Sequence, residues 1–204
     1  MTTTSPERHQ PPTPGANGGE HRHRPETGSY LPPTPAPWYR RHGRDLVGMV
    51  LLLATLSFVW GRARHTWYWI DEGISIGIAS QPLARIPELL AQDGAPPLYY
   101  VVLHFWMALF GTSEAATHIL SLLFALATVP AALWAGWSLF GRRTGWVCAA
   151  LAALSPFVAE YANETRMYSL VALVSVLASA TFLHAFVFGR RRYLPAFILS
   201  LALG

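Results

Sequence analysis

The run ILSLLFALATVPAALWAGWSLF, residues 119–140, decides the fold class of this chain. It contains no charged residue and is longer than the roughly 20 residues that an α-helix needs to cross a bilayer. Arg142 and Arg143 follow it at once, and basic residues are typical at the cytoplasmic end of a membrane span. We therefore expect a membrane-spanning helix here.

The composition of the whole chain also indicates a membrane protein. Of its 204 residues, 52% are hydrophobic and only 13% are charged, whereas soluble domains carry about 25% charged residues. The apolar residues gather in blocks separated by short stretches with arginine or acidic residues. All 15 basic residues are arginines, and most lie beside apolar blocks, as the positive-inside rule expects. The net charge of +4 therefore does not indicate a nucleic-acid partner.

These patterns predict an all-α fold, a polytopic transmembrane helix bundle with an N-terminal tail. Residues 1–45 are rich in Pro, Thr, Gly, His and Arg and bury too little apolar surface to offset their ordering entropy, so we expect a disordered tail. The outer loop expected at 61–118 includes Leu98–Phe110, which is too short to span and predicts an interfacial or re-entrant helix. The spans expected in the region 46–204 are 46–60, 119–140, 146–161, 168–188 and an incomplete 193–204.

The arginine clusters give this arrangement a direction. With Arg40, Arg41 and Arg44 in the cytoplasm, successive crossings put residues 61–118 outside, 142–143 inside, 161–167 outside and 190–192 inside. Every short arginine cluster then lies on the cytoplasmic side. A crossing by Leu98–Phe110 would reverse this pattern. The sequence thus predicts a cytoplasmic N-terminus in the plasma membrane and places two polar segments on one outer face.

The first of these segments is Trp67-Tyr-Trp-Ile-Asp71-Glu72-Gly. An interfacial aromatic belt explains its three aromatic residues but not the acid pair. Carboxylates close to a bilayer are costly and are commonly functional. A carboxylate at such a position is suited to accept a proton from a hydroxyl group.

The second segment is Glu160-Tyr-Ala-Asn-Glu164-Thr-Arg166-Met-Tyr168. An arginine on the outer side is contrary to the usual charge bias, so the position of Arg166 calls for a structural or functional explanation. One interpretation is an ion pair with Glu160 or Glu164. The other is a guanidinium that faces a phosphate, whose geometry its planar fork matches. The residues leave both interpretations open.

A third motif, Gly94-Ala-Pro-Pro-Leu-Tyr-Tyr100, leads into the short apolar segment. Its prolines favour a sharp entry into a helix. The tyrosines could bond a ligand, but interfacial packing is their commoner role. We also assign His104 on that segment to packing.

Together these motifs resemble glycosyltransferase family 39 of the GT-C fold, which includes protein O-mannosyltransferases and aminoarabinose transferases. The resemblance covers residues 45–204 and resides in the order and spacing of the motifs. Relatives often have a histidine or lysine before the proline pair, where this chain has Ala95. The matching residues are Asp71-Glu72, Pro96-Pro97-Leu98-Tyr99-Tyr100, Phe110-Gly-Thr-Ser-Glu114 and Glu164-Thr-Arg166-Met-Tyr168.

The resemblance implies an enzyme that moves a sugar from a polyprenyl-phosphate carrier to a hydroxyl on a protein, lipid or glycan, with inversion at the anomeric carbon. It implies that Asp71 is the base, that Glu72 supports the site, and that Glu164 and Arg166 lie near the donor phosphate. We add Tyr168 and Tyr99 to the predicted substrate-binding residues. Asp71 and Glu72 could also hold a divalent cation, but two adjacent carboxylates alone make a poor site for one, so no metal ligand is assigned.

Two other classes of protein stay open at this point. A transporter or permease fragment would place ionisable groups near the bilayer midplane, whereas the acids here lie mostly beside the apolar blocks. An inactive, truncated membrane protein is the other alternative. Because the last apolar block is short and the resemblance covers only the N-terminal part of such enzymes, we expect a fragment without transferase activity of its own.

Overall fold

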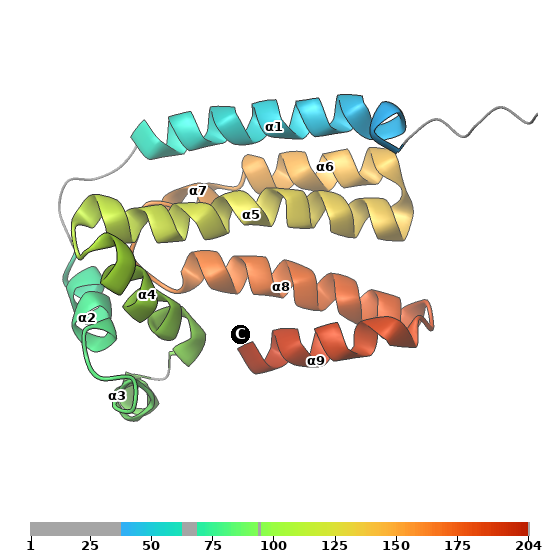
Figure 1. The fold of residues 1–204 in the computed structure, drawn as a ribbon. Helices are drawn as coiled ribbons and strands as arrows, with labels where there is room; N and C mark the ends of the chain where they lie inside the picture. Colours follow the sequence, from blue (N-terminus) through green and yellow to red (C-terminus); the bar gives the residue numbers. More distant parts are fainter. Residues whose placement is uncertain (1–37, 63–68, 94, 204) are drawn as a thin grey trace, which may run out of the picture. The chain divides into compact units, whose positions relative to one another are not determined.

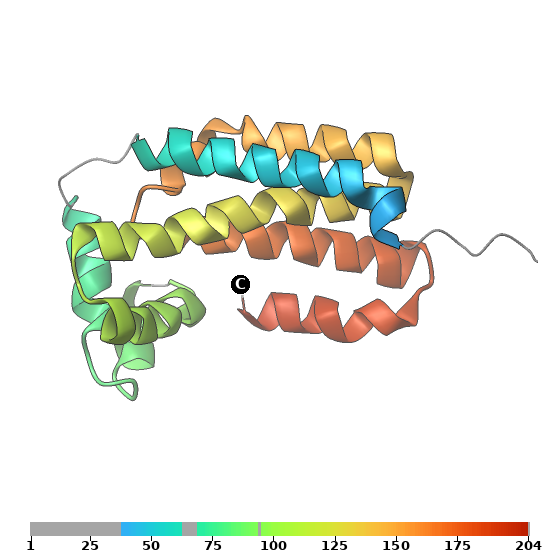
Figure 2. The ribbon, with the colours of Figure 1, turned by 45° about the horizontal axis from the view of Figure 1, so that its top comes forward.

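Every secondary-structure element in the described part of this computed structural model is a helix or a helical turn. The structure describes residues 38–62, 69–93 and 95–203, so most of the predicted tail lies outside it. The long helices lie side by side, and the short helices α2–α4 gather where α5 begins (Figures 1 and 2). The α-helices are α1 Trp38–Arg62, α2 Ile70–Ala79, α3 Ile86–Asp93, α4 Pro97–Phe110, α5 Glu114–Phe140, α6 Arg142–Ala153, α7 Pro156–Tyr161, α8 Tyr168–Phe182 and α9 Leu194–Leu203.

Three of the described helices are long and apolar enough to cross a membrane: residues 42–62, 114–140 and 168–187. The first begins earlier than predicted, because α1 starts at Trp38. Residues 38–45, which composition assigned to the tail, are therefore helical. Asp45 explains part of this extension, since its buried carboxylate accepts hydrogen bonds from Arg142 and from the Trp146 indole, at 2.8 and 3.0 Å for the closest pairs. These bonds hold the start of α1 against α6.

The block at 146–161 is not the single span that its apolar residues predicted. It divides into α6, which ends at Ala153, and the short α7, which starts at Pro156. Proline lacks an N–H and suits the first turn of a new helix, and the Ser155 hydroxyl caps that turn by accepting from the Val158 N–H. In Figure 1, α6 and α7 together still return the chain to the end where α5 begins.

The return is made possible by close contact between α5 and α6. Gly141, with φ +99°, alone joins the two helices; this backbone conformation favours glycine. Further along, a Cβ at Gly145 would lie 2.8 Å from the Leu133 carbonyl oxygen, so only glycine fits there. Small residues at a helix crossing let the two backbones approach each other in this way.

The remaining elements complete α8 and support the short helices. Helix α8 continues through a π-helical turn, Leu183–Val187, and a 3₁₀ turn, Arg191–Tyr193, leads into α9. Leu98–Phe110 lies in α4, whose 14 residues are too few for a span; the interfacial or re-entrant position of this segment stays a prediction. Buried residues of α4 pack with Leu120 of α5 and Leu170 of α8 in one apolar core, which fixes α2–α4 at this end of the long helices.

Candidate functional site

The two polar segments that the arginine pattern placed on one face are in direct contact. Asp71 lies in the first turn of α2, and Arg166 lies in the connection from α7 to α8. Their side chains form an ion pair, with 2.7 Å between Arg166 Nη1 and Asp71 Oδ2. Neither acid that the sequence offered as a partner, Glu160 or Glu164, forms this pair.

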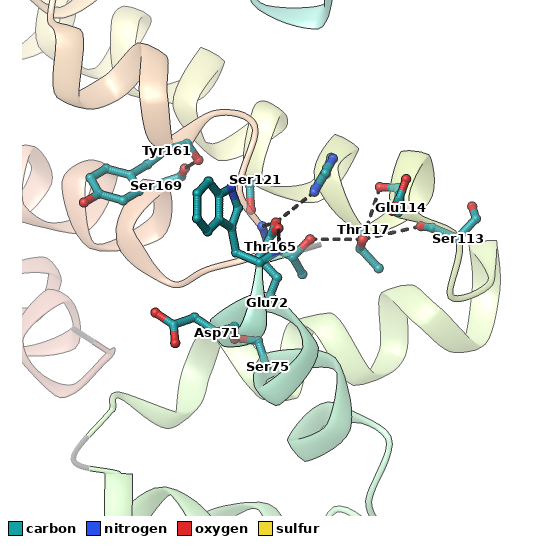
Figure 3. A network of polar contacts seen from close by, with 12 residues as sticks. Asp71, Glu72, Ser75, Ser113, Glu114, Thr117, Ser121, Tyr161, Thr165 and Ser169 are labelled. Carbon is teal, nitrogen blue, oxygen red and sulfur yellow. Dashed lines mark hydrogen bonds and ion pairs between the residues drawn. The ribbon is translucent and has the colours of Figure 1, made fainter. Parts of the chain in front are cut away.

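Glu72, the neighbour of Asp71, turns the other way into the protein (Figure 3). Only 2% of it is exposed. Its Oε1 accepts hydrogen bonds from His118 Nε2 at 2.8 Å and from the Thr165 N–H at 2.6 Å. Its Oε2 accepts from the Trp69 N–H at 3.0 Å, as the glutamate of a capping box does. One carboxylate therefore joins α2, α5 and the connection before α8.

The charge on Glu72 is sustained by these partners. Burial acts to raise the pKa of Glu72, but the hydrogen bonds from His118, Thr165 and Trp69 outweigh burial and hold the pKa below its ordinary value. A carboxylate has only acceptor atoms when ionised, so His118 donates through Nε2. Glu72 is thus an ionised group whose oxygens are already engaged.

A second polar tie runs beside the first. The Thr165 hydroxyl donates to the Thr117 hydroxyl at 3.0 Å, and Thr117 in turn donates to the Glu114 carbonyl at 3.2 Å (Figure 3). Thr165 is fully buried. Further along, the Ser169 hydroxyl donates to the Tyr161 carbonyl and closes the turn between α7 and α8. Arg166 therefore projects from a backbone that is fixed on both sides.

These segments enclose a pocket of about 480 Å³. Asp71 is an accessible wall, with 67% of its side chain exposed, whereas Arg166 lies deeper, with 18% exposed. Arg166 also donates from Nη2 to the Tyr168 hydroxyl at 3.1 Å, while its buried Nε has no hydrogen-bond partner among the described residues. The lining residues are Trp69, Ile70, Asp71, Glu72, Tyr161, Glu164, Arg166 and Tyr168.

The pocket holds more acid than base, and this imbalance affects Glu164. Burial, followed by the negative charges of Glu72 and Glu160, raises the pKa of Glu164 above its ordinary value. The guanidinium of Arg166 opposes this shift without cancelling it. Glu164 therefore binds a proton more readily than a solvated glutamate does.

Tyr99 lies in the apolar core rather than in the pocket. It is fully buried, and its hydroxyl bonds to the Ser121 hydroxyl at 2.9 Å. Its ring packs edge-on against Tyr100, and it does not line the pocket. The apolar core of α4 and α5 encloses the side chain, and contact between Tyr99 and a substrate stays a prediction. His104 has the packing role expected, bonding to the Ala79 carbonyl at 2.7 Å.

Two residues of the site were not singled out from the sequence. His118 is a lone histidine at the edge of an apolar block, and Thr165 acts through its backbone N–H and its hydroxyl. Trp69 is not the serine or threonine that a capping-box sequence needs at its first position, so nothing in the sequence indicates that Glu72 faces inward. Within the part of the chain that the structure describes, no group of three or more His, Cys, Asp or Glu side chains is arranged to hold a metal ion.

Comparisons of the chain with protein-family models, curated proteins and solved structures find no match.

Proposed function

We propose that this chain belongs to a membrane glycosyltransferase that transfers a sugar from a polyprenyl-phosphate donor to a hydroxyl on the outer face of the plasma membrane. The observation that carries the proposal is the pairing of Asp71 with Arg166 at 2.7 Å in one pocket. An accessible carboxylate and a deeper guanidinium are the two groups that such a transfer needs within reach of one another.

The chemistry assigns each group one task. The acceptor hydroxyl attacks the anomeric carbon, and a new carbon–oxygen bond forms while the bond to the phosphate oxygen breaks. The phosphate leaves with the bonding electron pair, and Arg166 stabilises the charge that develops on it. The hydroxyl proton passes to Asp71 as general base. Inversion follows because the acceptor attacks from the side opposite to the leaving phosphate.

The position of each side chain supports these roles. Asp71 is mostly exposed, so an acceptor can approach it from water. Arg166 retains a buried Nε with no partner in the described part of the chain, and a phosphate oxygen would satisfy that donor. Glu72 is a poor alternative base because its carboxylate already accepts three hydrogen bonds. The rim residues Trp69 and Ile70 suit a ligand that carries an isoprenoid chain.

A transfer assay tests the proposal against a transporter fragment or an inactive protein. Membranes that contain the complete gene product are given a polyprenyl phosphate bearing a radiolabelled sugar, and label is followed into protein, lipid and glycan fractions. We expect label in one of these fractions, and transfer slower by about 10²–10⁴ with Asp71→Asn. Label that crosses the membrane unchanged would instead indicate a transporter, and label that stays on the carrier would refute the transferase.

The orientation in the membrane is a separate part of the proposal, with the N-terminus in the cytoplasm and α2–α4 outside. In a Cys148→Ala background, Glu88→Cys on exposed α3 should react with an impermeant thiol reagent in intact cells. Arg143→Cys, an exposed position at the opposite end of α5, should react only after the cells are opened. The reverse labelling pattern would invert the proposed topology.

A further inference from the structure

The site depends on a buried pair of side chains to which the proposed reaction gives no chemical role. Glu72 and His118 are each 2% exposed and lie 2.8 Å apart. His118 belongs to α5, which is otherwise an apolar helix, and its imidazole points at a carboxylate from α2. A buried polar pair of this kind is weak evidence for stability, because the cost of desolvating the carboxylate offsets much of the attraction. Its position is more informative.

Glu72 and its hydrogen-bond partner Thr165 are chain neighbours of the groups that the proposed reaction uses. Glu72 follows Asp71 in the chain, and Thr165, whose N–H bonds to Glu72 at 2.6 Å, precedes Arg166. Thr117, next to His118, receives the Thr165 hydroxyl at 3.0 Å. Two adjacent residues of α5 thus hold both the segment that carries the carboxylate and the segment that carries the guanidinium.

From this geometry we infer that Glu72 and His118 are positioning residues that set the distance between Asp71 and Arg166. The inference rests on the proposed function and deepens it. His118 donates a hydrogen bond to the Glu72 carboxylate and orients it, and Glu72 then fixes Thr165, so that Arg166 meets the donor phosphate with its donors aligned. Without His118, the carboxylate turns toward other partners and releases Thr165. The guanidinium then loses its orientation while its charge is unchanged.

The test compares two substitutions at His118 with the same two at a histidine of purely structural position. His118→Gln retains a side-chain N–H that can reach Glu72, and His118→Leu does not. His104, whose ring bonds to a backbone carbonyl at 2.7 Å, provides the matched pair His104→Gln and His104→Leu. The dissociation constant of a polyprenyl monophosphate is measured in lipid nanodiscs on the folded, monodisperse fraction of each variant of the complete gene product.

We expect His118→Leu to weaken lipid-phosphate binding about tenfold, within the range of typical coupling between sites, and to lower turnover about a hundredfold, as misplacement by about 1 Å can. The dissociation constant of His118→Gln for the lipid phosphate should lie within about threefold of that of the parent, because the bond to Glu72 that couples the two segments is largely retained. Both His104 variants should bind as the parent does. Parental binding by His118→Leu, or equal losses in His118→Leu and His118→Gln, would overturn the inference. If His118→Leu does not fold, Glu72→Gln takes its place with the same expected loss.

A second measurement does not depend on the ligand. Nitroxide labels at Ile74→Cys and Glu160→Cys, both exposed, report the separation of α2 and α7 by pulsed electron paramagnetic resonance in the Cys148→Ala background. The distance distribution should be narrow in the parent and with His118→Gln, and broad with His118→Leu. A narrow distribution with His118→Leu refutes the positioning role whether or not the lipid binds. A parent with that narrow distribution but no affinity for polyprenyl phosphate would instead refute the proposed function.

Discussion

Replacing Asp71 by asparagine should change donor binding and turnover in opposite directions. In the structure, the Asp71 carboxylate occupies one terminal nitrogen of Arg166 at 2.7 Å. A donor phosphate that uses the same guanidinium must therefore compete with Asp71. The asparagine substitution would keep the size of the side chain and remove the competing charge, so the lipid phosphate should bind more tightly to the variant.

The exposure of the two side chains limits the size of this effect. Asp71 is 67% exposed and Arg166 is 18% exposed, and exposed ion pairs contribute only about 0–1 kcal/mol. Because 1.4 kcal/mol corresponds to a factor of ten, removal of the competition should tighten binding by at most about fivefold. Turnover should fall by about 10²–10⁴, the usual contribution of a general base.

The two quantities are measured on the same preparation of the complete gene product in nanodiscs. A polyprenyl monophosphate gives the dissociation constant, and initial rates with the labelled sugar donor give turnover. Glu88→Gln, an exposed carboxylate on α3 outside the pocket, is the control for loss of one negative charge and should change neither. Weaker lipid binding by Asp71→Asn would show that Asp71 does not compete for Arg166. Turnover within tenfold of the parent would remove Asp71 as the base.

Three further predictions concern neighbouring features. Arg166→Lys should weaken polyprenyl phosphate binding by about tenfold and lower turnover, because an ammonium lacks the planar fork that reaches Asp71 and the Tyr168 hydroxyl together. Unchanged affinity for polyprenyl phosphate would argue against bidentate recognition of the phosphate. Since the pKa of Glu164 is raised, Glu164 should be protonated at a higher pH than a solvated glutamate, and phosphate affinity should increase as the pH falls. Glu164→Gln should bind phosphate tightly without this increase at low pH, and an identical pH profile of affinity in the variant would exclude Glu164 as the cause of the increase. Gly145→Ala should destabilise the protein by about 1–3 kcal/mol through overpacking, measured as a lower unfolding temperature in detergent. Gly77→Ala is the control and should not lower that temperature, because a Cβ there meets nothing within 4 Å. Equal unfolding temperatures for the two variants would contradict the close contact of α5 and α6.

The sequence was most informative where a property belongs to a continuous run. The three long apolar helices correspond to predicted blocks, apart from shifts at their ends. Arginine placement also predicted that Asp71 and Arg166 share one face, and the structure brings them into contact. The break at Ser155-Pro156 was overlooked because the residues on both sides are apolar, although serine before proline is a common helix start.

The sequence was least informative about pairings between distant segments. Nothing near Arg166 distinguishes Asp71 from Glu160 or Glu164 as its partner, since the choice depends on how α2 is placed beside the connection from α7 to α8. The role of Thr165 is carried partly by a backbone N–H, which every residue except proline has, so its identity gives little sign of that bond. Tyr99 belongs to a motif of the family resemblance and was added to the predicted substrate-binding residues, but α4 packs it into the apolar core.

The three bonds to Glu72 also affect how the protein is made. Its partner Thr165 is 93 residues further along the chain, which at a synthesis rate of about 5–20 residues per second is a delay of roughly 5–20 s. Throughout that interval the carboxylate has to remain hydrated, because its full set of partners is complete only once Thr165 has been made. The pocket therefore assembles only after the connection from α7 to α8 has been made. A nascent chain arrested before Thr165 would display α2 with an incompletely paired acid.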